Sequence, residues 1–142
     1  MSIYADTSFL VSLYVLDDNS AAAAARMKRA KLPLAISSLG ELELANAICL
    51  RIFRKELTRP EAKAAFTLIR NDIGAGVLRV TGISIAGLER AKRIAQKQTP
   101  LLGSRTLDVL HVALAVVLKA DAFYTFDERQ RRLAAAEGLA VF

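Results

Sequence analysis

The sequence predicts an α/β fold in which a parallel sheet is covered by helices on both faces. Short apolar segments alternate along the chain with longer segments of helical character, which is typical of parallel strands joined by helical connections. The apolar segments are largely continuous rather than alternating with polar residues, as expected for strands that are buried on both sides. The chain has 142 residues and shows no internal repeat or linker, so we expect one domain over residues 1–142.

Five strands are expected, and each is a short run of mainly apolar residues. Asp6 directly follows the first run, and Asp127 lies shortly after the fourth. The expected strands cover residues 3–5, 34–36, 77–80, 122–124 and 139–142.

About seven helices are expected between and after these strands. Thr7 or Ser8 is expected to cap the first helix, and Thr58, with a proline and an acid in the turn that follows, marks the start of the fourth. The segment 99–103 contains a proline and a glycine and is predicted to be a loop. The expected helices cover residues 7–14, 21–29, 37–55, 58–73, 84–96 and 105–119, and a short basic helix follows Asp127.

Composition restricts the partners and the metal chemistry. The net charge is +6, which favours a polyanionic partner such as RNA, DNA or an acidic protein tail, although simple solubility also accounts for it. Cys49 is the only cysteine and His111 the only histidine, so no intramolecular disulfide can form and a structural zinc site lacks ligands. Any metal would need oxygen ligands, which points to Mg²⁺ or Mn²⁺.

The same features indicate a location in the cytoplasm. A single cysteine fits a reducing compartment. No apolar run approaches the roughly 18 residues of a membrane span, so we expect no contact with a membrane. The first residues lack the basic segment of a signal peptide and reach an acid at Asp6.

Two acids follow predicted strands. Asp6 comes after the first strand and Asp127 after the fourth, and each precedes a helix. In open parallel sheets, ligands bind beyond the carboxyl ends of the strands, so both carboxylates could face one crevice. Capping of the following helix is an alternative role for each of them.

Two further acids lie in apolar helices. Asp108 and Glu43 are each surrounded in sequence by aliphatic residues, and a buried carboxylate is costly unless it is paired or bound to a metal. For Asp108 the first turn of the helix offers another reason, because the helix dipole favours an acid there. Glu41 competes with Glu43, but the two point in directions roughly 200° apart around the helix, so only one can belong to the site.

A cluster of these acids would have a clear chemical purpose. At an effective dielectric constant of about 20, two like charges about 5 Å apart cost about 3 kcal/mol. A cation in the cluster removes that cost, and acids that hold a metal beside a basic surface are what metal-assisted phosphoryl transfer requires.

Four short motifs resemble those of PIN-domain ribonucleases, and most of all the VapC-type toxins of bacterial and archaeal toxin–antitoxin pairs. Asp6-Thr7-Ser8 resembles the opening motif after the first strand, and Ser37 with an acid six residues later resembles the second, which selects Glu43 over Glu41. The third and fourth resemble the segments Asp108-Val-Leu-His-Val-Ala and Thr125-Phe-Asp127. The resemblance covers essentially the whole chain.

The resemblance implies a five-stranded parallel sheet in the order 3-2-1-4-5 and endonucleolytic cleavage of RNA that depends on Mg²⁺ or Mn²⁺. A metal-activated water would attack. Thr7 and Thr125 would orient the carboxylates or metal-bound water. A VapB-type antitoxin and a homodimer are the implied partners. The carboxylates that would hold the metal are Asp6, Glu43 and Asp108, with Asp127 assisting directly or through water.

Two other function classes remain open, and three further classes are disfavoured by the sequence. A catalytically silent PIN-like module that binds RNA or protein, and a stand-alone RNA-processing nuclease, are the open alternatives. A phosphatase of the Asp-x-Asp type would need a second acid at Ser8, and a receiver domain would need a mid-chain acid where residues 44–71 contain no Asp. A P-loop motif is absent.

The remaining candidates receive simpler interpretations. The arginines that follow Asp127, which are Arg129, Arg131 and Arg132, are expected to contact phosphates. A second basic group has two open interpretations, an ordinary solvated surface or a rim for RNA or antitoxin: Arg51, Arg54, Lys55, Arg59 and Lys63. Packing roles are expected for His111, Cys49, Tyr4, Tyr14, Tyr124 and the alanines at 21–25.

Overall fold

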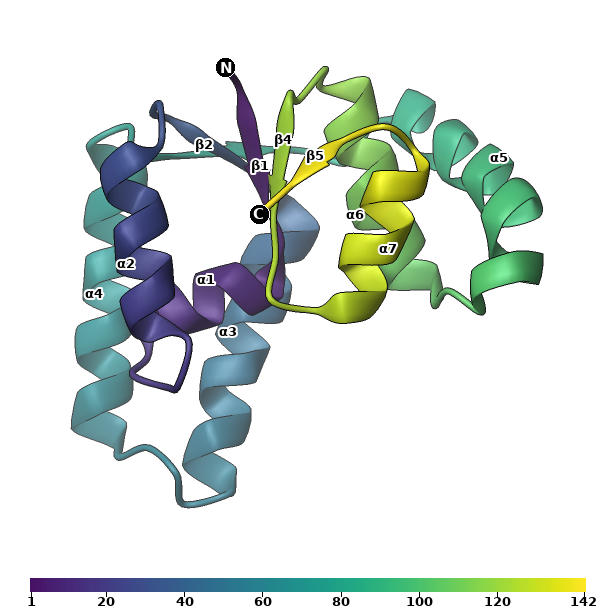
Figure 1. Ribbon diagram of the computed structural model, residues 1–142. Coiled ribbons are helices and arrows are strands. Elements are labelled where there is room, and N and C mark those ends of the chain that lie inside the picture. The colour runs from purple at the N-terminus through teal and green to yellow at the C-terminus, as the bar shows by residue number, and fades with distance from the viewer.

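The computed structural model describes residues 1–142 and contains one five-stranded sheet (Figure 1). All strands are parallel, and their order is β3-β2-β1-β4-β5. The predicted fold class and strand order are therefore confirmed. The strands are β1 (Ile3–Ala5), β2 (Leu34–Ser37), β3 (Leu78–Thr81), β4 (Ala122–Tyr124) and β5 (Ala140–Val141).

Seven helices surround the sheet, as predicted. The first four gather on one side of it and the last three on the other (Figure 1). They are α1 (Thr7–Tyr14), α2 (Ser20–Arg29), α3 (Ser38–Phe53), α4 (Arg59–Gly74), α5 (Ile85–Leu102), α6 (Thr106–Val117) and α7 (Glu128–Ala136).

The central strand β1 separates two hydrophobic cores. Successive side chains of a strand point to opposite faces, so Ile3 and Ala5 join the core beneath α1 to α4, whereas Tyr4 joins the core beneath α5 to α7. All three residues are fully buried. Covering both faces explains why the strands are apolar without alternation.

Side chains at the strand ends start several helices. Asp6 caps α1, because its carboxylate accepts a hydrogen bond from the Phe9 backbone N–H at 3.0 Å. The prediction that Thr7 or Ser8 caps this helix is wrong, because both residues already lie within its first turn. Thr58 caps α4 in a reciprocal capping box, as its sequence context predicts.

The predicted loop at 99–103 is wrong, because α5 continues through it. The helix includes Pro100 and ends at Leu102. Pro100 lies in the last turn, so the one hydrogen bond that its missing N–H removes is lost near the end of the helix. Gly103 ends the helix in the left-handed conformation, with φ of 63°, and its N–H donates to the Thr99 carbonyl at 2.8 Å.

Two packing predictions also need correction. Cys49 is exposed on α3 rather than buried in a core, because the inward face of that helix is formed by Leu44 and Ile48. Within the alanine run at 21–25, only Ala23 is buried, so a single residue makes the close contact. None of the helices combines the length and the apolar character that crossing a membrane would require.

Candidate active site

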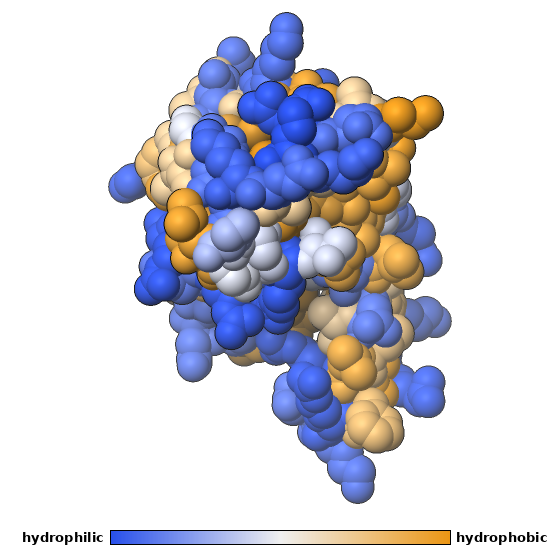
Figure 2. All heavy atoms as spheres, turned by 90° about the vertical axis from the view of Figure 1, so that its right-hand side faces the viewer, coloured by the Kyte–Doolittle hydropathy of each residue, from blue (hydrophilic) through white to orange (hydrophobic).

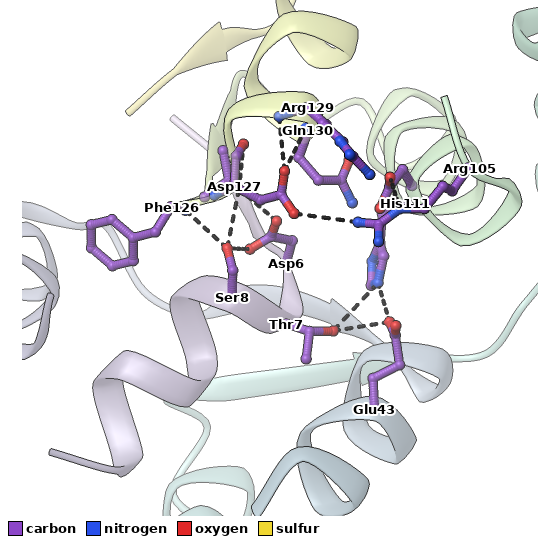
Figure 3. Close-up of polar contacts among 12 residues, drawn as sticks. Asp6, Thr7, Ser8, Glu43, Arg105, His111, Phe126, Asp127, Arg129 and Gln130 are labelled. Atoms are coloured by element: carbon purple, nitrogen blue, oxygen red, sulfur yellow. Dashed lines mark hydrogen bonds and ion pairs between the residues drawn. The ribbon is translucent and has the colours of Figure 1, made fainter. Parts of the chain in front are cut away.

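A small polar pocket lies at the carboxyl ends of the central strands. Its volume is about 120 Å³, and none of its lining residues is hydrophobic. The four acids singled out in the sequence all line it, although they come from four separate parts of the chain (Figure 3). The lining residues are Asp6, Thr7, Ser8, Glu43, Arg105, Asp108, His111, Asp127 and Gln130.

Asp6 is the most deeply buried acid of the pocket. Only 2% of its surface is exposed. Its Oδ1 accepts hydrogen bonds from Ser8 Oγ at 2.7 Å and from the Phe9 N–H, and its Oδ2 accepts one from Thr125 Oγ1 at 2.6 Å. Burial raises the pKa of Asp6, and the three hydrogen bonds oppose that rise without cancelling it.

Glu43 is held from two sides. Thr7 Oγ1 donates a hydrogen bond to Glu43 Oε1 at 2.9 Å, and His111 Nε2 contacts the same oxygen. Partial burial by itself raises the pKa of Glu43, but the contacts with His111 and Thr7 and the positive charge of Arg105 outweigh it, so the pKa is lowered. The carboxylate is therefore kept ionised.

A buried chain of polar contacts runs behind Glu43. The Tyr4 hydroxyl lies 2.8 Å from His111 Nδ1 and 3.1 Å from Ser37 Oγ, which in turn caps α3 by accepting from the Gly40 N–H. An ionised carboxylate only accepts, so the contact with Glu43 places a proton on His111 Nε2, and in the neutral ring Nδ1 then accepts from Tyr4. His111 and Tyr4 were expected to have packing roles, whereas both are buried residues that also make polar contacts.

Asp108 and Asp127 lie on the other side of the pocket. Asp108 is 8% exposed in the first turn of α6. Asp127 caps α7 by accepting from the backbone N–H groups of Arg129 and Gln130, and its own N–H donates to Thr125 Oγ1 at 2.9 Å. Asp127 therefore both caps a helix and lines the pocket, two roles that were expected as alternatives.

Arg105 bridges these two acids. Its Nε donates to Asp108 Oδ2 at 3.0 Å, and its Nη2 lies 3.6 Å from Asp127 Oδ2 (Figure 3). Arg105 was not among the site residues predicted from the sequence. Its position three residues before Asp108, at the start of a helix, could have indicated that the two side chains would pair.

The structure separates the two competing glutamates. Glu43 lines the acidic pocket, whereas Glu41 is exposed and lies against α4 beside Phe66, Ile69 and Arg70. A larger hollow of about 550 Å³ between α5 and α6 contains none of the four acids. We place the candidate site in the smaller pocket, because convergent titratable groups indicate chemistry better than volume does.

The donor set suits a hard divalent cation. The four acids offer only oxygen ligands, which Mg²⁺ and Mn²⁺ prefer. In this structure the acids line the pocket without surrounding a common point, because no three Asp, Glu, His or Cys side chains lie close enough together to hold one metal ion. The chemistry of the residues therefore fits such an ion, while their side chains would have to draw together to bind it.

The comparisons with known proteins assign the family. An all-parallel sheet with acids gathered at its carboxyl edge defines an α/β protein with an acidic pocket. The model of the PIN domain matches residues 3–136, which is nearly the whole chain. The protein belongs to the PIN domain family. No curated protein matches its sequence.

Solved structures share the fold at low sequence identity. VapC20 of Mycobacterium tuberculosis, described as a sarcin–ricin loop cleaving toxin, superimposes with a TM-score of 0.71 at 19% identity, covering 98% of this chain and 97% of that one. FitAcB from Neisseria gonorrhoeae gives 0.69 at 16% identity, with 99% and 96% covered. VapBC2 from Rickettsia felis, bound to a DNA fragment from its promoter, gives 0.66 at 16% identity, with 100% and 98% covered.

The raised pKa of Asp6 predicts that Asp6→Asn stabilises the metal-free protein at neutral pH. The folded protein keeps the Asp6 proton at pH values where the unfolded chain, with a pKa of about 3.9, has lost it. Stability therefore falls as the pH rises from that value through the raised folded pKa. The melting temperature of Asp6→Asn in EDTA should exceed that of the wild type near pH 7 and match it below about pH 4.

Asp121→Asn provides a control of opposite sign. The N–H and hydroxyl of Ser2 donate to the Asp121 carboxylate and lower its pKa, so that carboxylate stabilises the fold above the unfolded pKa. Its replacement should give no gain at neutral pH. A melting temperature of Asp6→Asn at or below that of the wild type near pH 7 would contradict the assignment of Asp6 as a destabilising buried carboxylate.

Proposed function

We propose that the protein is an endoribonuclease that depends on Mg²⁺ or Mn²⁺ and that it acts as the toxin of a VapBC-type toxin–antitoxin pair. The observation that carries the catalytic part is that Asp6, Glu43, Asp108 and Asp127 all line one polar pocket. Four acids that line one small pocket repel one another, and a bound divalent cation would remove that cost. A catalytically silent module would have no use for the complete set.

The residues of the pocket divide into ligands and the groups that hold them. Asp6, Glu43 and Asp108 would bind the ion, with Asp127 assisting directly or through water. A bound divalent ion would lower the pKa of a water molecule and offset charge on the scissile phosphate. Thr125 and Thr7 keep the carboxylates of Asp6 and Glu43 oriented through hydrogen bonds.

RNA is the substrate class that the net charge and the comparison with VapC20 favour. The net charge of +6 attracts a polyanion, and the acidic pocket itself cannot. The face on the α5 side of the molecule is mainly hydrophilic, with separate hydrophobic patches (Figure 2). The structurally similar VapC20 is described as cleaving the sarcin–ricin loop, which supports RNA over DNA.

A protein partner is proposed for the hairpin formed by α3 and α4. The two helices leave four large hydrophobic side chains exposed, which a protein partner would cover. VapBC2 from Rickettsia felis and a complex from Klebsiella pneumoniae, described as a toxin–antitoxin complex, share the fold. We propose a VapB-type antitoxin as the partner, and a homodimer as the assembled form. The exposed side chains are Leu42, Leu50, Phe53 and Leu68.

The proposed ligands predict which carboxylates are essential for cleavage. Asp108→Asn and Glu43→Gln should each lower the rate of RNA cleavage in Mg²⁺ by at least about a hundredfold, because each removes a proposed metal ligand. Glu41→Gln is the matched control, since it makes the same change on the other face of α3 and should retain most activity. Cleavage of a labelled RNA, with EDTA as the metal-free control, measures all three. Wild-type rates in Asp108→Asn, or a reversed order of the two glutamates, would refute the assignment.

The basic start of α7 is proposed to contact RNA phosphates. Arg129 and Arg132 are exposed, and Arg131 is half-buried, and all three lie within about one and a half turns of Asp127. Glu128 pairs with Arg131 at 3.7 Å and Arg132 at 3.4 Å, and such exposed pairs are weak enough for RNA to replace.

Changing Arg129, Arg131 and Arg132 together to Gln should weaken binding to unrelated RNA sequences alike. The dependence of log affinity on log salt should flatten by up to about three phosphate contacts. Cleavage sites should stay the same, because phosphate contacts do not distinguish bases. RNA titrations at several salt concentrations, with Asp108→Asn present to block cleavage, measure the slope. An unchanged slope would show that this segment faces away from RNA.

The toxin assignment predicts growth arrest when the protein is expressed alone. Co-expression of a small adjacent reading frame should restore growth, because the antitoxin would cover the exposed hairpin and the pocket. The Asp108→Asn variant should not arrest growth, since arrest requires cleavage. Growth curves in several hosts measure this effect. Normal growth in all of them, with RNA cleavage intact in vitro, would favour a stand-alone RNA-processing nuclease.

A further inference from the structure

Arg105 is the only lysine or arginine among the residues that line the acidic pocket. Its guanidinium group contacts both Asp108 and Asp127, and Figure 3 shows the contact with Asp127 across the pocket. Guanidinium groups stay protonated at all physiological pH values, so Arg105 supplies a permanent positive charge. That charge stands among the carboxylates that are proposed to bind the metal ion.

Little apart from these acids holds the Arg105 side chain in place. The residue occupies the N-cap position of α6, where it makes no side-chain capping bond, and 59% of its side chain is exposed. Its hydrogen bond to Asp108 and its ion pair with Asp127 are its polar contacts. An exposed ion pair of this kind contributes little free energy, so the guanidinium group can exchange one anionic partner for another.

We propose that Arg105 is a displaceable counterion of the pocket, which leaves Asp108 and Asp127 when a divalent cation binds and then contacts the phosphate that is to be cleaved. The proposal rests on the proposed nuclease function and extends it to a residue that none of the four motifs contains.

Charge balance supports both parts of the proposal. In the metal-free pocket Arg105 offsets the repulsion between neighbouring acids, but the same charge opposes the entry of a cation. Once Asp108 turns to the cation, Arg105 loses its closest partner. A guanidinium group donates two parallel hydrogen bonds to a phosphate, and Arg105 is the one side chain of the pocket with that geometry.

The first test measures metal binding without any substrate. Calorimetric titration with Mn²⁺ should show that Arg105→Gln binds the ion more tightly than the wild type, by about fivefold, which is what an exposed ion pair can provide. Arg105→Lys keeps the charge and should bind Mn²⁺ nearly as the wild type does. Arg93→Gln is the matched control, because Arg93 is exposed on α5, away from the pocket, and its loss changes the net charge equally. Unchanged or weaker Mn²⁺ binding by Arg105→Gln would overturn displacement.

The second test measures cleavage of RNA as a function of Mg²⁺ concentration. Arg105→Gln should reach its half-maximal rate at a lower Mg²⁺ concentration than the wild type, yet its maximal rate should be lower by on the order of tenfold or more, because one donor to the phosphate is lost. Because this loss of maximal rate exceeds the gain in metal affinity, the Arg105→Gln curve should level off at a lower Mg²⁺ concentration but lie below the wild-type curve throughout. A maximal rate equal to that of the wild type would overturn the phosphate contact.

Failure of this proposal differs from failure of the proposed function. If the wild type binds Mn²⁺ and cleaves RNA while Arg105→Gln behaves identically, Arg105 is a surface residue and the nuclease assignment stands. If the wild type neither binds Mn²⁺ nor cleaves RNA, both fail. Loss of Mn²⁺ binding in Asp108→Asn is the reference that identifies the pocket as the site of binding.

Discussion

The hydrogen bonds around the buried Asp6 carboxylate are the interaction on which the rest of the site depends. Through them one side chain joins the end of the central strand to the first turn of α1 and to Thr125, which follows β4. Thr125 in turn accepts from the N–H of Asp127 and so fixes the start of α7. Neighbouring parallel strands bring these segments to one edge of the sheet, and the carboxylate then sets their relative positions.

The two sides of the pocket differ in how firmly their acids are held. Glu43 is supported by Thr7 and by a buried chain of polar groups that reaches from His111 through Tyr4 to the cap of α3. Asp108 has a half-exposed arginine as its polar partner. Glu43 is thus arranged before any ligand arrives, whereas Asp108 can rearrange at small cost, which is consistent with a pocket that closes around an ion.

Much of the fold could be predicted from the sequence, because strand and helix signals depend on local patterns. Continuous apolar runs located the five strands, and the box at Thr58 located the start of α4. The helix through Pro100 was mispredicted because the proline and glycine were taken as loop residues, whereas Pro100 lies in the last turn and Gly103 ends the helix. The exposure of Cys49 could not be predicted, because it depends on which face of α3 meets the sheet.

The part of the candidate site that could be predicted is its set of acids, because each of them is recognisable from its residue type and its place in the sequence. Acids at strand ends and in apolar helices are conspicuous, and the structure brings Asp6, Glu43, Asp108 and Asp127 into one pocket. Partners such as His111 and Arg105 were not predictable in the same way. A histidine in an apolar helix and an arginine before a helix are ordinary features, and only the three-dimensional arrangement gives each a carboxylate to contact.

The position of Ser37 at the junction of β2 and α3 has a consequence for how this protein can diversify. Its hydroxyl fixes the start of α3, and Glu43 follows within two turns. The distance between the sheet and the Glu43 carboxylate is therefore fixed where the helix begins. The far end of the helix, near Arg54, lies about 16 Å further along its axis, given a rise of about 1.5 Å per residue. Insertions or deletions in the turn between α3 and α4 would therefore reshape the outer surface of the molecule and leave the acidic pocket unaltered. Evolution can change what the hairpin contacts independently of the chemistry at its base.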